Sequence, residues 1–259
     1  MKRIIILVAA AAVALSSCST LSKLNSERLL QGGVYAAQAI TLPESDVQNY
    51  VSQYIAQLDA QSPVLPASDP YVKRLNNLVG KLTHVGDQPL NYKVYRNDEV
   101  NAFACADGSV RVYTGIMDLM NDDELLTVIG HEIGHVALKH TYQQTRRSLL
   151  TSAAFEGIAS TSDKVAALTD SQLGAIGQAM IEAHYSKKQE TEADEFSYSF
   201  ITAAGRNPWT IVQAFEKLQT TGGSAVSGPV SSLFSTHPDT ETRIKNITKR
   251  CEADGYVRP

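Results

Sequence analysis

The chain has 259 residues, of which 43% are hydrophobic and 19% are charged, and its formal net charge is −4. These values are ordinary for a globular protein, and the length suits one large domain. The acidic balance leaves no basic surface for nucleic acid, so we expect no nucleic-acid partner.

The first residues have the pattern of a bacterial lipoprotein signal. A basic start precedes an apolar run over residues 4–15, which is too short to span a bilayer stably. Residues 15–18 then resemble a lipobox, so we expect removal of residues 1–17 and attachment of lipid to Cys18. Ser19, in place of aspartate, favours sorting to the outer membrane. The alternative is an ordinary secretory signal with an incidental cysteine.

The next segment, residues 18–65, is expected to be a lipidated tether with one or two helices. Apolar residues recur there at helical spacing, and Pro66 marks the start of the main domain, expected at residues 66–255. The first elements of that domain are one helix and three short strands in a small sheet, expected at residues 71–82, 90–95, 100–104 and 109–114.

An HExxH motif occupies residues 131–135, inside an apolar helical pattern that follows an N-cap at Asn121. His131 and His135 are four residues apart, so one helix face offers two imidazole nitrogens to one metal ion. Glu132 beside them is suited to activate a metal-bound water. Two surface histidines at this spacing by chance are the alternative, but the apolar neighbours indicate a buried helix, where unpaired polar groups are costly.

Gly134 lies within this motif, although glycine costs about 1 kcal/mol in a helix interior relative to alanine. It indicates either close packing against another helix or room for a substrate beside the metal, and the two are compatible. The segment that follows, residues 141–174, is rich in Ala and Ser and is expected to be helical.

A third metal ligand is expected in a long helix over residues 176–204, which ends at Gly205. Glu190 and Asp194 are four residues apart and share a face, whereas Glu192 points elsewhere. If Glu190 binds the metal, Asp194 can accept a hydrogen bond from one of the histidines. A solvated helix face is the alternative for the two glutamates alone.

The C-terminal part is expected to contain two helices with a flexible loop between them, at residues 209–218, 221–232 and 240–253. Cys105 and Cys251 would both meet an oxidising periplasm, and whether they form a disulfide stays open. His140 is five residues after His135 and is expected to lie off its helix face, whereas His84 and His184 lack partner spacing. All three are expected to be structural or exposed.

Four motifs in order resemble the M48 family of zinc metallopeptidases, which are gluzincins. They are residues 101–104, residues 130–135, the Glu-x-x-Ala-Asp pattern of residues 190–194, and His237-Pro238 followed by Arg243. Such a set is more specific than HExxH alone. The layout, a lipoprotein signal before one peptidase domain, is most similar to the outer-membrane lipoproteins of this family.

The resemblance implies one Zn²⁺ per chain, with His131, His135 and Glu190 as ligands and Glu132 as catalyst. It also suggests that His237 approaches the zinc. There it would occupy the open coordination position and hold the enzyme latent, or polarise the substrate carbonyl. The alternative is that His237 only helps to cap the last helix.

The strand at Asn101, Ala102, Phe103 and Ala104 is the candidate substrate edge. In zinc peptidases an extended peptide can add to such an edge through backbone hydrogen bonds. An ordinary inner strand is the alternative.

Together these features predict an α+β fold, mainly α: a zincin-like metallopeptidase domain with a small sheet beside the HExxH helix. The predicted function is a zinc endopeptidase of the bacterial envelope that cleaves unfolded or misassembled envelope proteins. Its partners would be protein or peptide substrates and the membrane, through the N-terminal lipid, and envelope proteins are candidate partners. The domain would face the periplasm from the outer membrane. A latent or silent zinc-binding lipoprotein with a chaperone-like role is the alternative.

Overall fold

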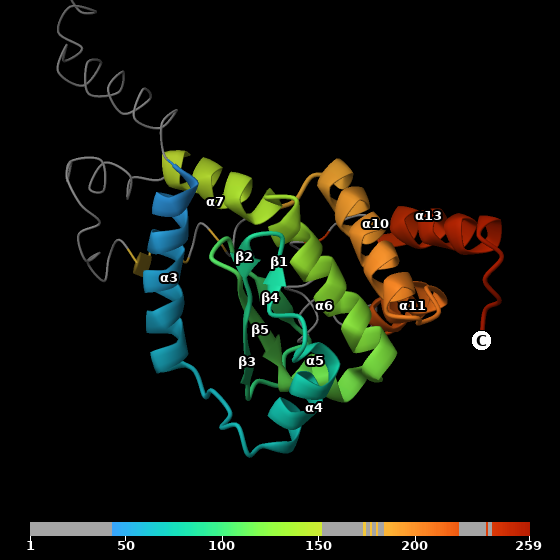
Figure 1. Ribbon diagram of the computed structural model, residues 1–259, viewed down its shortest axis with the longest axis horizontal. Coiled ribbons are helices and arrows are strands. Elements are labelled where there is room, and N and C mark those ends of the chain that lie inside the picture. The colour runs from blue at the N-terminus through green and yellow to red at the C-terminus, as the bar shows by residue number, and fades with distance from the viewer. Residues whose placement is uncertain are drawn as a thin grey trace, which may run out of the picture. The chain divides into compact units, whose positions relative to one another are not determined.

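The computed structural model describes residues 43–151, 173–174, 177, 180, 184–222, 237 and 240–259, all in the unit Pro43–Pro259 (Figure 1). Its helices are α3 (Glu44–Gln61), α4 (Pro70–Val79), α5 (Thr114–Leu119), α6 (Asp122–Ala137), α7 (His140–Thr151), α10 (Lys187–Ala203), α11 (Trp209–Gly222) and α13 (Thr240–Ala253). Its strands are β1 (His84–Val85), β2 (Gln88–Pro89), β3 (Asn91–Tyr95), β4 (Ala102–Ala104) and β5 (Ser109–Tyr113). The predicted α+β fold, mainly α, is confirmed.

The main sheet has three strands in the order β3-β5-β4. β5 pairs in parallel with β3 and antiparallel with β4, with Val112 opposite both Val94 and Ala102. The turn between β4 and β5 contains Gly108 at φ +82°, a conformation that favours glycine. Among the described strands β4 has a neighbour on one side only, so it is the outer strand next to the HExxH helix.

That helix, α6, lies between the sheet on one side and α10 and α11 on the other (Figure 1). Every residue from Glu124 to Val136 is buried, as the apolar pattern predicts. The N-cap at Asn121 is confirmed: its side chain accepts hydrogen bonds from the backbone N–H groups of Asp123 and Glu124, and the Glu124 carboxylate accepts one from Asn121 N–H.

Two glycines let α10 approach α6 closely. A Cβ built on Gly134 would lie 3.1 Å from Cβ of Phe196, and one on Gly130 would lie 2.7 Å from Cδ1 of Phe200. The neighbours of Gly134 are therefore on a helix, so this position serves close helix packing.

The prediction of one continuous helix over residues 176–204 is wrong. Residues 184–186 are not helical, and α10 begins anew at Lys187. Ser186 is the reason, because its hydroxyl accepts from Gln189 N–H while Gln189 accepts from Ser186 N–H, a capping box. Other boundaries shift slightly: the strand predicted from residue 100 begins at Ala102, and the helix predicted to residue 218 continues to Gly222.

The first described helix, α3, is joined to the sheet through Asp59. This carboxylate accepts from Arg111 of β5 through two hydrogen bonds of 2.9 Å, and from Lys93 and Tyr95 of β3. Arg111 is only 2% exposed, so the ion pair is buried on its cationic side. Residues before Pro66 thus pack within the same unit, and the expected boundary at residue 65 stays a prediction.

Cys105 and Cys251 are both buried free thiols. Burial raises the pKa of both, that of Cys251 to about 11, so neither is a reactive thiolate at neutral pH. The signal, Cys18, most of the segment 141–174 and the loop that precedes His237 lie outside the described residues. Within the described ranges, no helix combines the length and apolarity needed to cross a membrane.

Candidate metal centre

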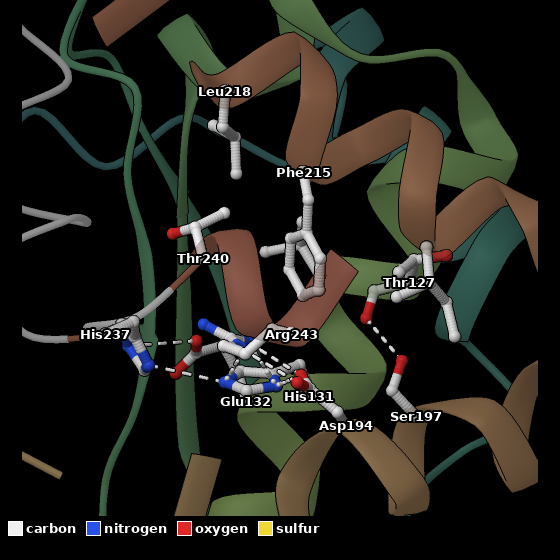
Figure 2. A pocket seen from close by; sticks show the side chains of 12 residues that line it. Thr127, His131, Glu132, Asp194, Ser197, Phe215, Leu218, His237, Thr240 and Arg243 are labelled. Atoms are coloured by element: carbon white, nitrogen blue, oxygen red, sulfur yellow. Dashed lines mark hydrogen bonds and ion pairs between the residues drawn. The ribbon is translucent and has the colours of Figure 1, made fainter. Parts of the chain in front are cut away.

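Three helical residues and one loop residue bring four metal-binding groups together. His131 and His135 come from one face of α6, Glu190 from the first turn of α10, and His237 from the residues just before α13. All four are buried, and one donor atom of each lies within 4.8 Å of the others. Figure 2 shows Glu132 beside His237 at the wall of a pocket, with Arg243 and Asp194 next to His131.

The spacing of these atoms fits a tetrahedral zinc site. Zinc binds histidine nitrogen at about 2.0–2.1 Å, so two tetrahedral ligands lie about 3.3 Å apart. His131 Nε2 lies 3.0 Å from His135 Nε2 and 3.3 Å from His237 Nδ1. Glu190 Oε1 lies 3.0 Å from His237 Nδ1 and 3.4 Å from His135 Nε2. Three nitrogens and one carboxylate oxygen are also a donor set that zinc prefers.

The protonation states also suit metal ligands. Burial alone would raise the pKa of Glu190, but His237, His135 and His131 outweigh it and hold the pKa of this carboxyl well below its usual range. Burial lowers the pKa of His135 well below its usual value, although Glu190 opposes this. Glu190 is therefore ionised and His135 neutral at pH 7, the forms in which both bind metal.

His131 is held from its other nitrogen by Asp194. Nδ1 of His131 lies 2.9 Å from Asp194 Oδ1, so the ring can donate there while Nε2 faces the cluster. Asp194 is paired in turn with Arg243 of α13, whose Nη1 also lies 2.7 Å from Glu190 Oε2. One buried arginine thus pairs with two buried carboxylates around the centre, and Figure 2 shows its contact with Asp194.

His135 is held by a second set of groups. Its Nδ1 lies 3.1 Å from Nδ1 of His140, and its ring stacks on Tyr185 with centroids 3.8 Å apart. His140 Nε2 lies 3.2 Å from Glu192 Oε2. The expectation that His140 lies off the face of His135 is therefore wrong. The helix ends at Ala137, and Lys139, at φ +58°, turns the chain back toward the cluster.

Glu132 is buried beside the cluster. Its Oε1 atom makes no hydrogen bond within the part of the chain that the structure describes, and lies 3.5 Å from His237 Nε2. A buried carboxylate oxygen without a hydrogen bond is costly, so it needs a further polar group, such as a water at the centre.

The predicted edge segment lies on the sheet side of α6. Ala102, Phe103 and Ala104 form β4, and Asn101 precedes it and accepts a hydrogen bond from Tyr113 N–H. Ala102 and Ala104 are buried, whereas Phe103 is partly exposed. On the opposite side of α6, apolar residues of α11 line the pocket of Figure 2, among them Phe215 and Leu218.

The structure adds two residues, His140 and Tyr185, that sequence reasoning did not place at the centre, and it gives Arg243 its partners. His140 reaches the centre because Lys139 adopts a left-handed conformation. Lysine does not favour that conformation, so the sequence holds no signal for this turn. Tyr185 lies in the non-helical residues 184–186 before α10, where sequence reasoning expected a continuous helix. Arg243 belongs to a recognised motif, but its two carboxylate partners lie 49 and 53 positions away in the chain.

Fold and centre together define a zinc-dependent peptidase, and comparison with known proteins agrees. The model of peptidase family M48 matches residues 66–251, so the chain belongs to this family, whose members use zinc. The predicted family resemblance, metalloprotease activity and zinc cofactor are confirmed.

Individual relatives cover nearly the whole chain. Metalloprotease LoiP of Escherichia coli strain K12 is 37% identical over 254 residues, which are 98% of each chain. Metalloprotease YcaL of the same strain is 36% identical over 249 residues, 96% of each chain. The beta-barrel assembly-enhancing protease of this strain is 28% identical over 211 residues, 76% of this chain and 42% of that protein.

Proposed function

We propose that His131, His135 and Glu190 bind the zinc ion and that Glu132 is the catalytic base of an endopeptidase. The single observation that carries this assignment is the spacing of 3.0 to 3.4 Å between neighbouring donor atoms of the buried cluster. Glu132 is adjacent to the cluster, and its buried Oε1 has no hydrogen bond among the described residues, so this carboxylate is suited to accept a proton there.

When bound, zinc polarises the scissile carbonyl and makes water a stronger nucleophile near neutral pH. Glu132 takes the proton from the attacking water and later passes it to the nitrogen of the leaving amine. Asp194 holds the His131 ring in the orientation that keeps Nε2 in the cluster. Arg243 is already ion-paired with two carboxylates, so it serves the geometry of the ligands rather than the substrate.

An extended peptide would bind along β4. The strand has a free side among the described strands and packs against α6, so a peptide paired with it would run past the HExxH helix. Asn101, Ala102, Phe103 and Ala104 would then supply backbone hydrogen bonds, which read no particular sequence. This mode suits unfolded protein substrates.

The cellular setting we propose is the outer membrane, facing the periplasm, with the chain anchored by lipid on Cys18. The basic start, short apolar run and lipobox support this. The name of the beta-barrel assembly-enhancing protease links that relative to beta-barrel assembly. By extension, this chain would remove unfolded or misassembled envelope proteins.

His237 favours a latent form of the same enzyme. Its Nδ1 lies at ligand distance from both His131 and Glu190, as a fourth zinc ligand would. A site closed by four protein ligands is typical of structural zinc. This observation also supports the second candidate, a silent zinc-binding lipoprotein with a chaperone-like role.

Zinc content and anchoring test these assignments. Glu190→Ala should lose zinc, whereas Glu192→Ala should keep most of it, and the reverse pattern would overturn the ligand set.

In a Gram-negative host, wild type should incorporate labelled palmitate and fractionate with the outer membrane, and Cys18→Ala should do neither. Equal labelling of both would overturn the lipid anchor.

A further inference from the structure

His140 occupies an unusual place for a residue outside the zinc ligands. It is the first residue of α7, it is 4% exposed, and it touches His135 through one ring nitrogen and Glu192 through the other. The three side chains come from α6, α7 and α10, so the contacts join three helices at the centre.

The two contacts of His140 allow one arrangement of protons. Nε2 of His135 lies 3.0 Å from His131 Nε2 and 3.4 Å from Glu190 Oε1, so this is the nitrogen that faces the metal. Its Nδ1 must then carry the proton. Because Nδ1 of His140 lies 3.1 Å from it, that atom must be an acceptor. The remaining proton of His140 is on Nε2, which points at a carboxylate oxygen of Glu192.

We propose that His140 and Glu192 are positioning residues for His135, through the hydrogen-bonded chain His135–His140–Glu192. The proposal rests on the assignment of His135 as a zinc ligand. It gives each histidine of the HExxH motif its own carboxylate: His131 contacts Asp194 directly, and His135 reaches Glu192 through a second imidazole. Such partners fix ring orientation and tautomer and increase the basicity of the ligand.

The two carboxylates differ in their surroundings. Asp194 is buried and paired with Arg243, whereas the side chain of Glu192 is 42% exposed and pairs with Lys188 at 3.6 Å. We therefore expect the acceptor at His140 to matter more than the charge at Glu192, since water can replace part of the latter. If His140 were only a packing residue, its shape alone would matter.

Three variants of the full-length protein in detergent separate these roles. His140→Phe keeps a ring but removes both nitrogens, and His140→Asn places a carbonyl oxygen near the position of Nδ1. Zinc affinity, measured by competition with a chelator, should fall about 10–100-fold in His140→Phe. It should recover in large part in His140→Asn and change less in Glu192→Gln. His84→Phe, at an exposed histidine, is the matched control and should keep wild-type affinity.

Wild-type affinity in His140→Phe, or an equal loss in His140→Asn, would overturn the proposal. The tautomer gives a second readout that needs no substitution. NMR of nitrogen-labelled, zinc-loaded wild type should find the proton of His140 on Nε2, and a proton on Nδ1 would overturn the chain of hydrogen bonds. His135→Ala distinguishes failure of the zinc ligand set from failure of the positioning role of His140. If it keeps full zinc affinity, the ligand set itself is wrong; if it loses zinc while His140→Phe does not, only the positioning role fails.

Discussion

Arg243 donates to both carboxylate oxygens of Asp194, from Nε at 2.8 Å and from Nη2 at 2.6 Å. The pair is buried, and Asp194 in turn faces Nδ1 of His131. Helix α13, more than a hundred residues after the HExxH motif, therefore holds the side chain that orients the first histidine.

Replacement of this arginine should cost much more than replacement of an exposed one. Arg243→Met removes the cation that pairs with the buried carboxylates of Asp194 and Glu190, so the free energy of unfolding should fall by about 3–5 kcal/mol. Arg250→Met, on the same helix but exposed, is the control and should cost less than about 1 kcal/mol. Urea denaturation measures both, and equal losses would contradict the role of Arg243.

Substitution of His237 tests the proposed latent state. If Nδ1 of His237 takes the fourth zinc position, His237→Ala frees it, and casein cleavage should increase several-fold at unchanged zinc content. His84→Ala should leave the rate unchanged. A rate that falls in His237→Ala at full zinc occupancy would instead make His237 a donor to the substrate.

The free energy of unfolding should decrease at acid pH, because Asp59 is ion-paired in the folded protein. Burial alone would raise the pKa of this carboxyl, but hydrogen bonds from Arg111, Lys93 and Tyr95 lower it to about 2 from its usual 3.8. A lowered pKa contributes stability above the unfolded value, and this contribution is lost as pH falls from about 4 toward 2.

The stabilisation of wild type relative to Asp59→Asn should therefore shrink by about 2 kcal/mol between pH 6 and pH 2. Denaturant unfolding at a series of pH values measures it. Asp98→Asn, at an exposed carboxylate, is the matched control. A difference between wild type and Asp59→Asn that does not change with pH would contradict this account.

The glycines of α6 should differ in their tolerance of alanine. At Gly130 the new Cβ would lie 2.7 Å from Phe200, so the free energy of unfolding should fall by about 1–3 kcal/mol. At Gly134 the approach to Phe196 is 3.1 Å, and about 1 kcal/mol of helix propensity offsets the strain. Thermal unfolding should rank Gly130→Ala below Gly134→Ala, and the opposite order would contradict the packing account.

The sequence predicted those parts of the site that depend on local periodicity. The four-residue spacing places His131 beside His135, and Glu190 beside Asp194, in any helix. The cap at Asn121 and the glycine stop at Gly205 are equally local signals.

What sequence reasoning missed depends on tertiary contacts. The break at residues 184–186 was missed because the sequence has a helical pattern on both sides of Ser186, which is the N-cap of α10. The contact of His140 with His135 requires the left-handed conformation of Lys139. The pairing of Arg243 with Glu190 requires that α10 and α13 pack against each other. None of these contacts has a periodic signature.

Casein cleavage by the purified wild type and by Glu132→Gln, with zinc quantified in both, tests whether this protein is a zinc peptidase with Glu132 as its base. Each protein should bind one zinc and only wild type should cleave, because the amide cannot take the proton from water. Equal cleavage by both would remove Glu132 as catalyst. Absence of cleavage in both, at full zinc occupancy, would contradict an active peptidase and favour the silent zinc-binding lipoprotein.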